Sequence, residues 1–374
     1  MKHRKIGLFE LVLFSLIIIE ELSKIYIFSN SEIYSLFANY IQLPLYVALL
    51  HYILKKSYTN RQLLIFAIIG VLLLYGYIKS GQAAYFRAFL LIIAAKNISF
   101  KKIVRICRYA ITSTFLFTVL LWICRISDGG IGRRGKLSFG YGHPNITAQT
   151  VMIIMLLYLA ERGNNAKTKD YILFETIAVA VMLLTGSKTA MIIIALTPIT
   201  ISFFKWYLAK KKLMIGNLII ECSQISIIVF TWLSAKMLPY SYLLKKLDLL
   251  LTNRLFLNYY QFNKYSLSLF GKNVSLYETG QVYNEIQNFW ATITCDCTYT
   301  ISLIIMGIIP TMLFAIAYIY LVKKAIASKD YIVIAIAVML AMYAFCESQL
   351  VEIYNNFVFF YICAKNNKRM EKLQ

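Results

Sequence analysis

The stretch that decides the fold is "ISLIIMGIIPTMLFAIAYIYLV", residues 301–322, a run that contains no charged side chain. A helix needs about 20 predominantly apolar residues to span the hydrocarbon core of a bilayer. Further apolar runs follow this pattern at residues 63–78, 152–159 and 331–345. Because the runs are continuous and do not alternate apolar with polar residues, they predict membrane-spanning helices rather than strands of a barrel.

The composition supports the same class of protein. Hydrophobic residues make up 60% of the 374 residues and charged residues only 15%, with a mean hydropathy of +0.65. Soluble domains contain roughly 45–50% apolar residues. The first apolar segment follows a basic start and lacks a small-residue cleavage site, so it reads as a retained anchor. We therefore expect an all-α polytopic membrane protein, with residues 1–374 forming a single membrane domain.

Hydropathy predicts about twelve transmembrane helices, the fourth of them short enough to be tilted or re-entrant. The expected segments are 6–28, 33–54, 62–79, 83–95, 106–125, 144–160, 171–185, 188–207, 214–235, 298–322, 331–347 and 350–364.

The distribution of Lys and Arg predicts the orientation. The chain has 39 Lys and Arg against 17 Asp and Glu, and most of the excess lies in alternate loops, such as 55–61, 96–105 and 323–329. The opposite short loops, 29–32, 80–82 and 347–356, contain no Lys or Arg. By the positive-inside rule, we expect a multi-pass protein of the cell membrane with both termini cytoplasmic. The positive charge is thereby explained without a nucleic-acid partner.

Two segments on the outer side break this charge rule. The first is 127–143, which carries Arg133, Arg134, Lys136 and His143, and the second is the long polar loop 237–297 before the tenth helix. Orientation does not require positive charge there. An anionic ligand at the outer membrane surface is the simplest explanation.

In "GYGHPN", residues 140–145, two glycines permit a tight turn and Pro144 suits the first position of a helix. His143 is then held at the mouth of the sixth segment, with Asn145 on its first turn. Free backbone N–H groups at a helix start bind anions, and nearby guanidinium groups bind phosphate bidentately. The alternative is an interfacial loop whose helix is capped and whose charges contact lipid headgroups.

Three further motifs hold isolated charges at predicted helix ends. Lys188 lies in "TGSKTA", Arg254 in "TNRL" at the start of a predicted amphipathic helix, and Asp296 in "CDCTY". Each also has a structural explanation: a snorkelling lysine in a hairpin turn, a surface arginine, and an acid that favours the positive end of a helix.

Known cofactor motifs are missing from the sequence. It contains no P-loop, Rossmann glycine pattern, HExxH or EF-hand, and the outer loops have few acids for a divalent cation. Cys295 and Cys297 lack partners at the spacing of a zinc site, so we expect them to be structural. We predict neither a metal nor a cofactor.

The motifs together resemble a known family. In order, "FGYGHPN" (139–145), "TGSKTA" (185–190), "TNRL" (252–255), "LFGKN" (269–273) and "DCTY" (296–299) are similar to the Wzy-type polysaccharide repeat-unit polymerases, which are related to O-antigen ligases. The resemblance covers roughly residues 85–310. Lys188 stands where the family more often has arginine, and Cys297 where asparagine is usual.

The resemblance implies a metal-independent glycosyltransferase with a GT-C-like membrane fold. It would join undecaprenyl-diphosphate-linked oligosaccharide repeats into capsule, O-antigen or exopolysaccharide at the outer face of the membrane. Its implied partners are the lipid-linked oligosaccharide, membrane lipids, and the flippase and chain-length regulator of the same pathway. The candidate catalytic residues are His143 as first choice for the base, Glu285 and Asp296 as rivals, and Arg254 for the diphosphate. The candidate substrate-binding residues are Arg133, Arg134, Lys136, Asn145, Lys188 and Tyr299.

Two other functions remain open at this stage. A flippase or transporter of lipid-linked oligosaccharide would need charged groups along a path through the membrane, whereas the polar residues here gather on one face. An O-antigen ligase would use similar chemistry with another acceptor.

The topology can be tested with single cysteines in a cysteine-free background. We expect an impermeant thiol reagent to label Ser275→Cys but not Gly163→Cys in intact cells, because positive loops stay on the cytoplasmic side. Labelling of the Gly163 variant but not of the Ser275 variant would reverse the predicted orientation.

Overall fold

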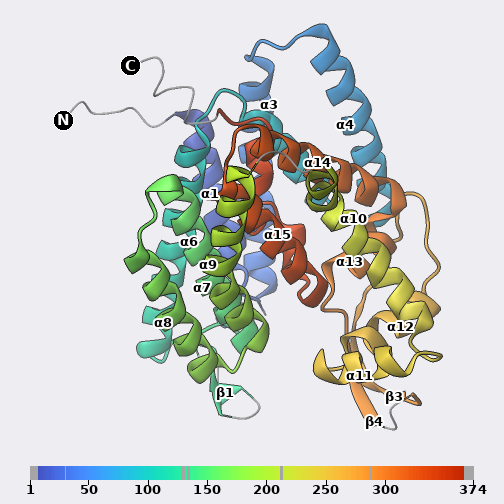
Figure 1. Cartoon of the computed structure of the whole chain (residues 1–374). Coiled ribbons are helices and arrows are strands. Elements are labelled where there is room, and N and C mark those ends of the chain that lie inside the picture. The colour runs from blue at the N-terminus through green and yellow to red at the C-terminus, as the bar shows by residue number, and fades with distance from the viewer. Residues whose placement is uncertain are drawn as a thin grey trace.

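The computed structural model describes residues 7–29, 31–127, 131–132, 135–210, 214–286 and 289–365, and this part of the chain is nearly all helical (Figure 1). The α-helices are α1 (Leu8–Leu22), α2 (Tyr26–Ser29), α3 (Glu32–Leu54), α4 (Asn60–Ser80), α5 (Ala84–Ala94), α6 (Phe100–Ile123), α7 (Pro144–Arg162), α8 (Thr168–Thr185), α9 (Lys188–Ala209), α10 (Met214–Met237), α11 (Tyr242–Leu250), α12 (Arg254–Lys264), α13 (Thr298–Ile301), α14 (Ile308–Ala327) and α15 (Tyr331–Cys346). Two short antiparallel pairs complete it: β1 (Ile131–Gly132) with β2 (Lys136–Leu137), and β3 (Tyr277–Asn284) with β4 (Phe289–Thr294).

Among the described residues, seven helices are long and apolar enough to cross a membrane, namely α3, α4, α6, α7, α9, α10 and α14. The helices α5 and α15 are also apolar but shorter. Many Leu and Ile side chains on α3 and α4 are exposed, such as Ile33, Leu54 and Ile78. Such faces are costly in water and favourable in lipid. The fold is therefore compatible with a polytopic helical membrane protein.

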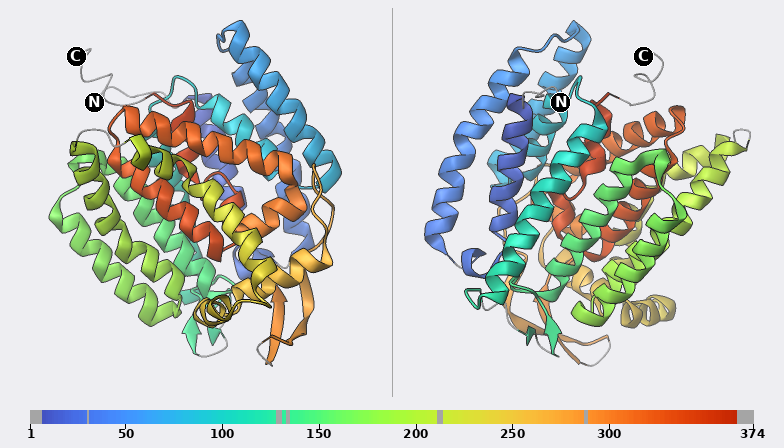
Figure 2. Two further views of the ribbon diagram at one scale, coloured as in Figure 1. Left: turned by 45° about the vertical axis from the view of Figure 1, so that its right-hand side comes forward. Right: turned by 90° about the vertical axis from the view of Figure 1, so that its left-hand side faces the viewer.

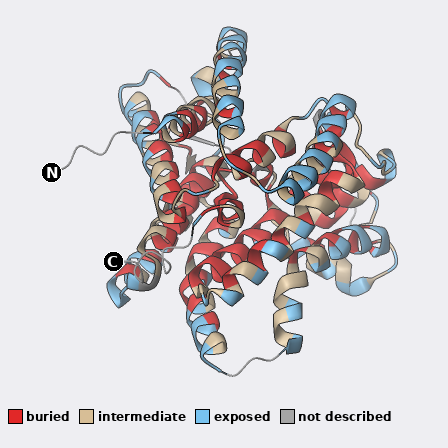
Figure 3. Ribbon diagram, turned by 90° about the horizontal axis from the view of Figure 1, so that it is seen from above, coloured by how far each residue is buried: buried red, intermediate tan, exposed pale blue. Residues whose placement is uncertain are grey.

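The centre of the bundle is α15. It packs against α7, α9, α10 and α14, and most of its residues are buried. Figure 2 shows the surrounding helices from two further sides, and Figure 3 shows that buried positions gather in the middle of the bundle. The β1–β2 pair, α11 and the β3–β4 hairpin lie together at one end of the bundle, here called the hairpin end (Figure 1).

Two of the expected segments are not single α-helices. The segment 298–322 is interrupted, because α13 passes into a π-helical turn, Ser302–Met306, and the chain then breaks at Gly307, whose φ is +95°. The segment 350–364 contains only 3₁₀ turns, Gln349–Val351 and Phe357–Ile362, joined by irregular chain. Hydropathy could not reveal either feature, because both segments are apolar whatever backbone they adopt.

The irregular C-terminal segment is held by a lysine from α14. Lys324 Nζ donates to the carbonyl oxygens of Tyr361, Ile362 and Ala364 at 2.7, 3.0 and 2.9 Å. Carbonyl groups buried without partners are costly, and one ammonium group supplies three donors. Lys324 therefore supplies the hydrogen-bond donors that the backbone N–H groups of an α-helix would otherwise supply to these carbonyl groups.

The break at Gly307 is paired with the "LFGKN" segment of the long loop. Ile308 and Ile309 donate their backbone N–H groups to the carbonyl oxygens of Ser268 and Leu269 at 3.0 and 2.9 Å. The backbone N–H of Lys272 donates in return to the carbonyl oxygen of Ile305 at 3.1 Å. The two segments approach so closely that a Cβ added at Gly271 would lie 1.8 Å from the carbonyl oxygen of Ile305. Only glycine fits this contact.

The predicted long loop, 237–297, therefore contains regular structure of its own. It folds into α11, α12 and the β3–β4 hairpin, in which Gln281 pairs with Thr292 and Asn284 with Phe289. The amphipathic helix predicted near Arg254 is α12, which buries Leu255, Phe256 and Phe262. It packs against α10.

Gly271→Ala should destabilise the protein strongly, because the added methyl group meets backbone that cannot move without breaking hydrogen bonds. We expect a large loss of folded, monodisperse protein in detergent, measured by fluorescence-detected size exclusion after a temperature series. Gly163→Ala is the control: its φ of +55° is also positive and therefore unfavourable for alanine, but nothing lies within 4 Å of the added Cβ. Equal melting behaviour of the two variants would show that the close contact is unimportant.

Candidate functional site

The turn that precedes α7 is fixed by neighbouring helices. Gly140 has a φ of +92°, and a Cβ there would lie 2.9 Å from the carbonyl oxygen of Thr118 on α6. The carbonyl oxygen of Gly140 accepts from the backbone N–H of Tyr26 at 3.0 Å and from the Ser127 hydroxyl at 3.2 Å. The turn is thereby attached both to α6 and to the α1–α2 connection.

His143 occupies the N-cap position of α7, and Pro144 is the first helical residue, as the sequence predicts. The imidazole is exposed, and its Nδ1 accepts the backbone N–H of Asn145 at 3.2 Å. In a neutral imidazole the other nitrogen then carries the proton. In this geometry His143 presents an Nε2–H donor, which suits an anionic oxygen and does not suit a hydroxyl proton.

Arg254 begins α12 after a strained turn. Thr252 and Asn253 both have positive φ, +54° and +68°, which is unfavourable for a β-branched residue such as threonine. The buried Asp248 carboxylate holds the turn in place, since its Oδ1 accepts the N–H groups of Leu255 and Phe256 at 2.8 and 3.1 Å. Strain of this kind persists where the surroundings over-determine the backbone, and it is frequent at functional sites.

The guanidinium of Arg254 meets a carboxylate from the far end of the sequence. Its Nη2 lies 2.8 Å from Glu347 Oε1, and the two side chains are 12% and 9% exposed. Nη1 contacts Thr252 Oγ1 at 3.3 Å, whereas the buried Nε has no hydrogen-bond partner. A buried donor without a partner is costly. Arg254 therefore retains a donor that an anionic ligand could use.

Asp296 and Glu347 form the acidic side of this cluster. Burial raises the pKa of Glu347 to about 7, with Asp296 raising it further and Arg254 opposing the shift. Burial also raises the pKa of Asp296, while the neighbouring Arg254 and, after it, His143 act against the rise. For Arg254 itself, burial lowers the pKa, but Glu347 together with Cys346, Asp296 and Tyr343 outweighs it, and the pKa of the guanidinium stays above its usual value. We refer to His143, Arg254, Asp296 and Glu347 as the charged cluster.

The structure brings two further candidate residues, Arg254 and His143, within electrostatic reach of Asp296. Glu285 lies exposed at the tip of the β3–β4 hairpin, and no contact between described residues links it to the cluster. Tyr299 is buried in the bundle, where its hydroxyl donates to the carbonyl oxygen of Ala341 at 2.7 Å. Its place indicates a packing role.

The remaining candidates lie along the hairpin end or beyond the described chain. Lys136 packs on Gly186 and approaches the carbonyl oxygen of Leu183 at 3.5 Å, so it covers the carboxyl end of α8. Lys188 is exposed at the first position of α9. Arg133 and Arg134 lie outside the described residues. The two expected structural cysteines, Cys295 and Cys297, are buried and free.

Sequence reasoning missed two residues of the site. Glu347 follows the apolar run of α15 directly, in a loop free of Lys and Arg, and Asp248 lies six residues before Arg254 on α11. An acid at the end of a fully apolar segment is a recognisable signal, because such a charge needs a partner. Nothing in the sequence indicates that this partner is Arg254.

Comparison of the chain with protein-family models, curated proteins and solved structures finds no match. Within the described chain, no group of three His, Cys, Asp or Glu side chains is arranged to hold a metal ion. The class is defined by the fold and the cluster themselves. This is a helical protein suited to a membrane, with a half-buried site in which an arginine lies beside two carboxyl groups whose pKa values are raised by burial.

The spare donors of Arg254 predict that inorganic diphosphate binds and stabilises the protein. At ten times its dissociation constant, a ligand that binds only the folded state contributes about 1.4 kcal/mol. We expect diphosphate to raise the melting temperature of the wild type but not of Arg254→Ala, each measured against sodium chloride at equal ionic strength. Lys236→Ala, which removes an exposed lysine at the same end, should respond like the wild type. A response that survives Arg254→Ala would place the anion elsewhere.

Proposed function

We propose that the chain is a metal-independent membrane glycosyltransferase, which polymerises undecaprenyl-diphosphate-linked oligosaccharide repeats into a surface polysaccharide. The observation that carries this proposal is the meeting of Arg254, His143 and Asp296 at one end of an apolar helical bundle. This reaction requires three groups: a cation, an N–H donor at a helix start and a carboxyl of raised pKa. The similarity of the "FGYGHPN" and "TNRL" motifs to the polymerases agrees with it.

Departure of the lipid diphosphate is the demanding part of the reaction. Negative charge develops on the diphosphate oxygen as the anomeric C–O bond breaks, and fixed donors in a half-buried site stabilise it. Arg254 supplies Nε, which has no other partner, and His143 supplies its Nε2–H at the start of α7. The ion pair with Glu347 and the Asp248 cap hold the guanidinium in place.

We assign the base to Asp296 rather than His143. The Nδ1 of His143 already accepts a hydrogen bond, so its free nitrogen is a donor. Asp296 is partly exposed, and its raised pKa makes its carboxylate a better proton acceptor than an ordinary aspartate. The pKa of Glu347 is also raised, but its Oε1 is engaged with Arg254.

The step then balances as follows. A hydroxyl oxygen of the acceptor sugar forms a bond to the anomeric carbon of the donor glycan, and its proton passes to Asp296. The anomeric C–O bond to phosphate breaks, and its electron pair leaves on undecaprenyl diphosphate. The proton on Asp296 is later returned to solvent. The product is a glycan longer by the transferred repeats, still attached to the acceptor's lipid carrier.

The proposed setting is the outer face of the bacterial cytoplasmic membrane, with both termini cytoplasmic. The hairpin end would then face outward, together with Lys136, Asn145, Lys188 and the arginines of the 127–143 loop. These groups would attract the lipid diphosphate to the site. The flippase and the chain-length regulator of the pathway are the expected protein partners.

Asp296→Asn should abolish polymerisation of purified lipid-linked repeats, and cells carrying it should accumulate single repeats.

Arg254→Ala should lower kcat by about 10²-fold or more, because one transition-state donor is lost. His143→Gln should retain more activity than Asp296→Asn, because a side-chain amide still donates to an anion. In the wild type, kcat/KM should fall as the pH is lowered through about 7, because protonation of Glu347 weakens its pair with Arg254, and it should fall further when Asp296, the base, is protonated. Lys236→Ala is the surface control for all assays.

Other outcomes distinguish the alternatives. Full activity of Asp296→Asn together with an inactive His143→Gln would return the base role to His143. Transfer of glycan to a lipid A acceptor without chain growth would identify a ligase. Movement of lipid-linked repeats across liposome membranes without new glycosidic bonds would identify a flippase.

A further inference from the structure

A polar cavity of about 210 Å³, separate from the charged cluster, lies at the carboxyl end of α1, where α1, α2, α3 and α5 meet. Its walls include Glu20, Ser23, Tyr34, Ser35, Gln42 and Arg87. None of the charged cluster residues lines it. No part of the proposed reaction uses these side chains, so their presence in an apolar bundle needs its own explanation.

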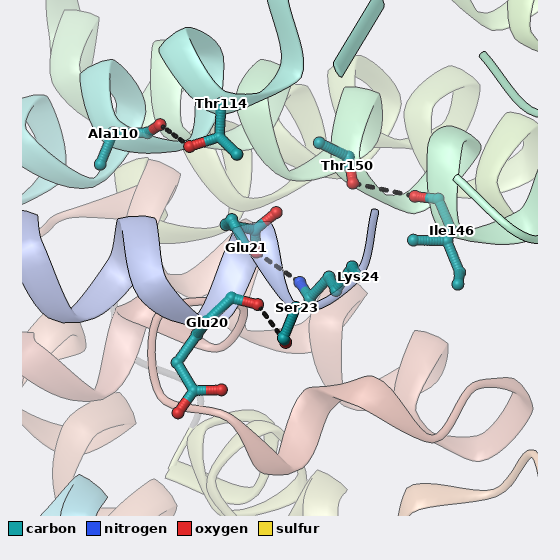
Figure 4. A network of polar contacts seen from close by, with 8 residues as sticks. All are labelled: Glu20, Glu21, Ser23, Lys24, Ala110, Thr114, Ile146 and Thr150. Carbon is teal, nitrogen blue, oxygen red and sulfur yellow. Dashed lines mark hydrogen bonds and ion pairs between the residues drawn. The ribbon is translucent and has the colours of Figure 1, made fainter. Parts of the chain in front are cut away.

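Glu20 is the central acceptor of this cavity. Its Oε1 accepts from Gln42 Nε2 at 2.8 Å and from Arg87 Nη1 at 3.1 Å. Figure 4 shows that the Glu20 carboxyl points away from the α6 and α7 residues Thr114 and Thr150, whereas Glu21 lies on their side. Glu21 forms its own ion pair with Lys24. Glu20 is therefore directed into the cavity.

The cavity offers both kinds of hydrogen-bonding group. Gln42 is only 7% exposed, and its Oε1 has no hydrogen-bond partner. Arg87 supplies donors and the Glu20 carboxylate supplies acceptors. The serine hydroxyls already donate to backbone carbonyl oxygens, so their oxygens add further acceptors. An orphaned buried acceptor is costly unless a ligand donates to it. A phosphate group carries only acceptors and would be repelled by Glu20. The hydrogen-bonding groups of the cavity therefore favour a ligand with several hydroxyl groups.

The size and the aromatic wall limit this ligand further. A volume of 210 Å³ equals about seven water molecules at ~30 Å³ each, which suits one monosaccharide. The rings of Phe28 and Tyr34 lie 5.0 Å apart and both line the cavity, which gives it an apolar side as well as a polar one. A sugar ring has the same two-sided character.

The cavity is also connected to the charged cluster. The backbone N–H of Tyr26, beside the cavity on α2, donates to Gly140 at 3.0 Å in the turn that ends at His143. Glu352 lies close to Glu20, Arg87 and Lys24, and only five positions separate it from Glu347. Two short pieces of chain thus join the cavity to the cluster.

We propose that this cavity is a glycan subsite that binds one sugar residue of the lipid-linked repeat. Glu20 and Gln42 accept hydrogen bonds from the hydroxyl groups of that sugar. The ligand class rests on the proposed function, whereas the binding itself does not require it. The subsite would hold a repeat at a set distance from Asp296. Its side chains are positioning and specificity groups and take no part in bond breaking.

Binding can be measured without catalysis. Saturation-transfer NMR on the full-length protein in detergent would use glucose, galactose, N-acetylglucosamine and glucuronate as probes, with glycerophosphoethanolamine as the lipid-headgroup probe. We expect transfer to at least one sugar in the wild type and a loss of fivefold or more in Glu20→Gln. Ser35→Trp fills the cavity without touching the Glu20 to Arg87 pair, and it should give the same loss. Glu32→Gln, an exposed carboxyl on the same helix as Ser35, is the matched control.

The outcomes separate the subsite from the proposed reaction. Sugar binding that is unchanged in Arg254→Ala but lost in Glu20→Gln and Ser35→Trp supports the subsite, even if the wild type makes no polymer. If polymerisation occurs, the same two variants should raise KM for lipid-linked repeats fivefold or more while kcat changes little. No transfer to any sugar, transfer that survives both cavity variants, or a preference for glycerophosphoethanolamine would overturn the proposal.

Discussion

The backbone hydrogen bonds around Gly307 are the constraint on which the hairpin end depends. An apolar environment requires a partner for every N–H and C=O group, so a helix can break only where another part of the chain replaces the lost bonds. Ser268, Leu269 and Lys272 do this for the break. The long loop is thereby attached to the bundle, and α13 is held as a short separate helix that precedes α14.

The charged cluster follows from this attachment. The carbonyl oxygen of Glu347 accepts the backbone N–H and the hydroxyl of Thr298 at 3.2 and 2.5 Å, which ties the start of α13 to the end of α15. Thr300 donates to Asn258 of α12 at 2.8 Å. Asp296, Arg254 and Glu347 therefore come from three elements whose ends are fixed to one another. Breaking a buried ion pair by removing one partner typically costs about 3–5 kcal/mol, so we expect the Arg254 to Glu347 pair to support the local fold as well as any ligand.

The two polar regions of the molecule share an arrangement. In each, an arginine meets a carboxylate at a helix end, Arg254 with Glu347 in one and Arg87 with Glu20 in the other. In each, a buried polar atom lacks a partner, Arg254 Nε in the first and Gln42 Oε1 in the second. The first has a spare donor and the second a spare acceptor. An anionic diphosphate and a hydroxyl-rich sugar are the ligands that would satisfy them respectively.

The amino-acid sequence by itself determined the features that depend on neighbouring residues. Long apolar runs form helices because each backbone group finds its partner four residues away, and His143 caps α7 because Pro144 and the preceding glycines set that turn. The break at Gly307 escaped prediction, since it depends on residues 268–272. The pairing of Arg254 with Glu347, 93 positions apart, and the cavity between α1, α3 and α5 were decided only by the tertiary structure. Hydropathy and motifs describe a segment by its own composition, whereas a buried charge or an orphaned acceptor is defined by what the rest of the chain places beside it.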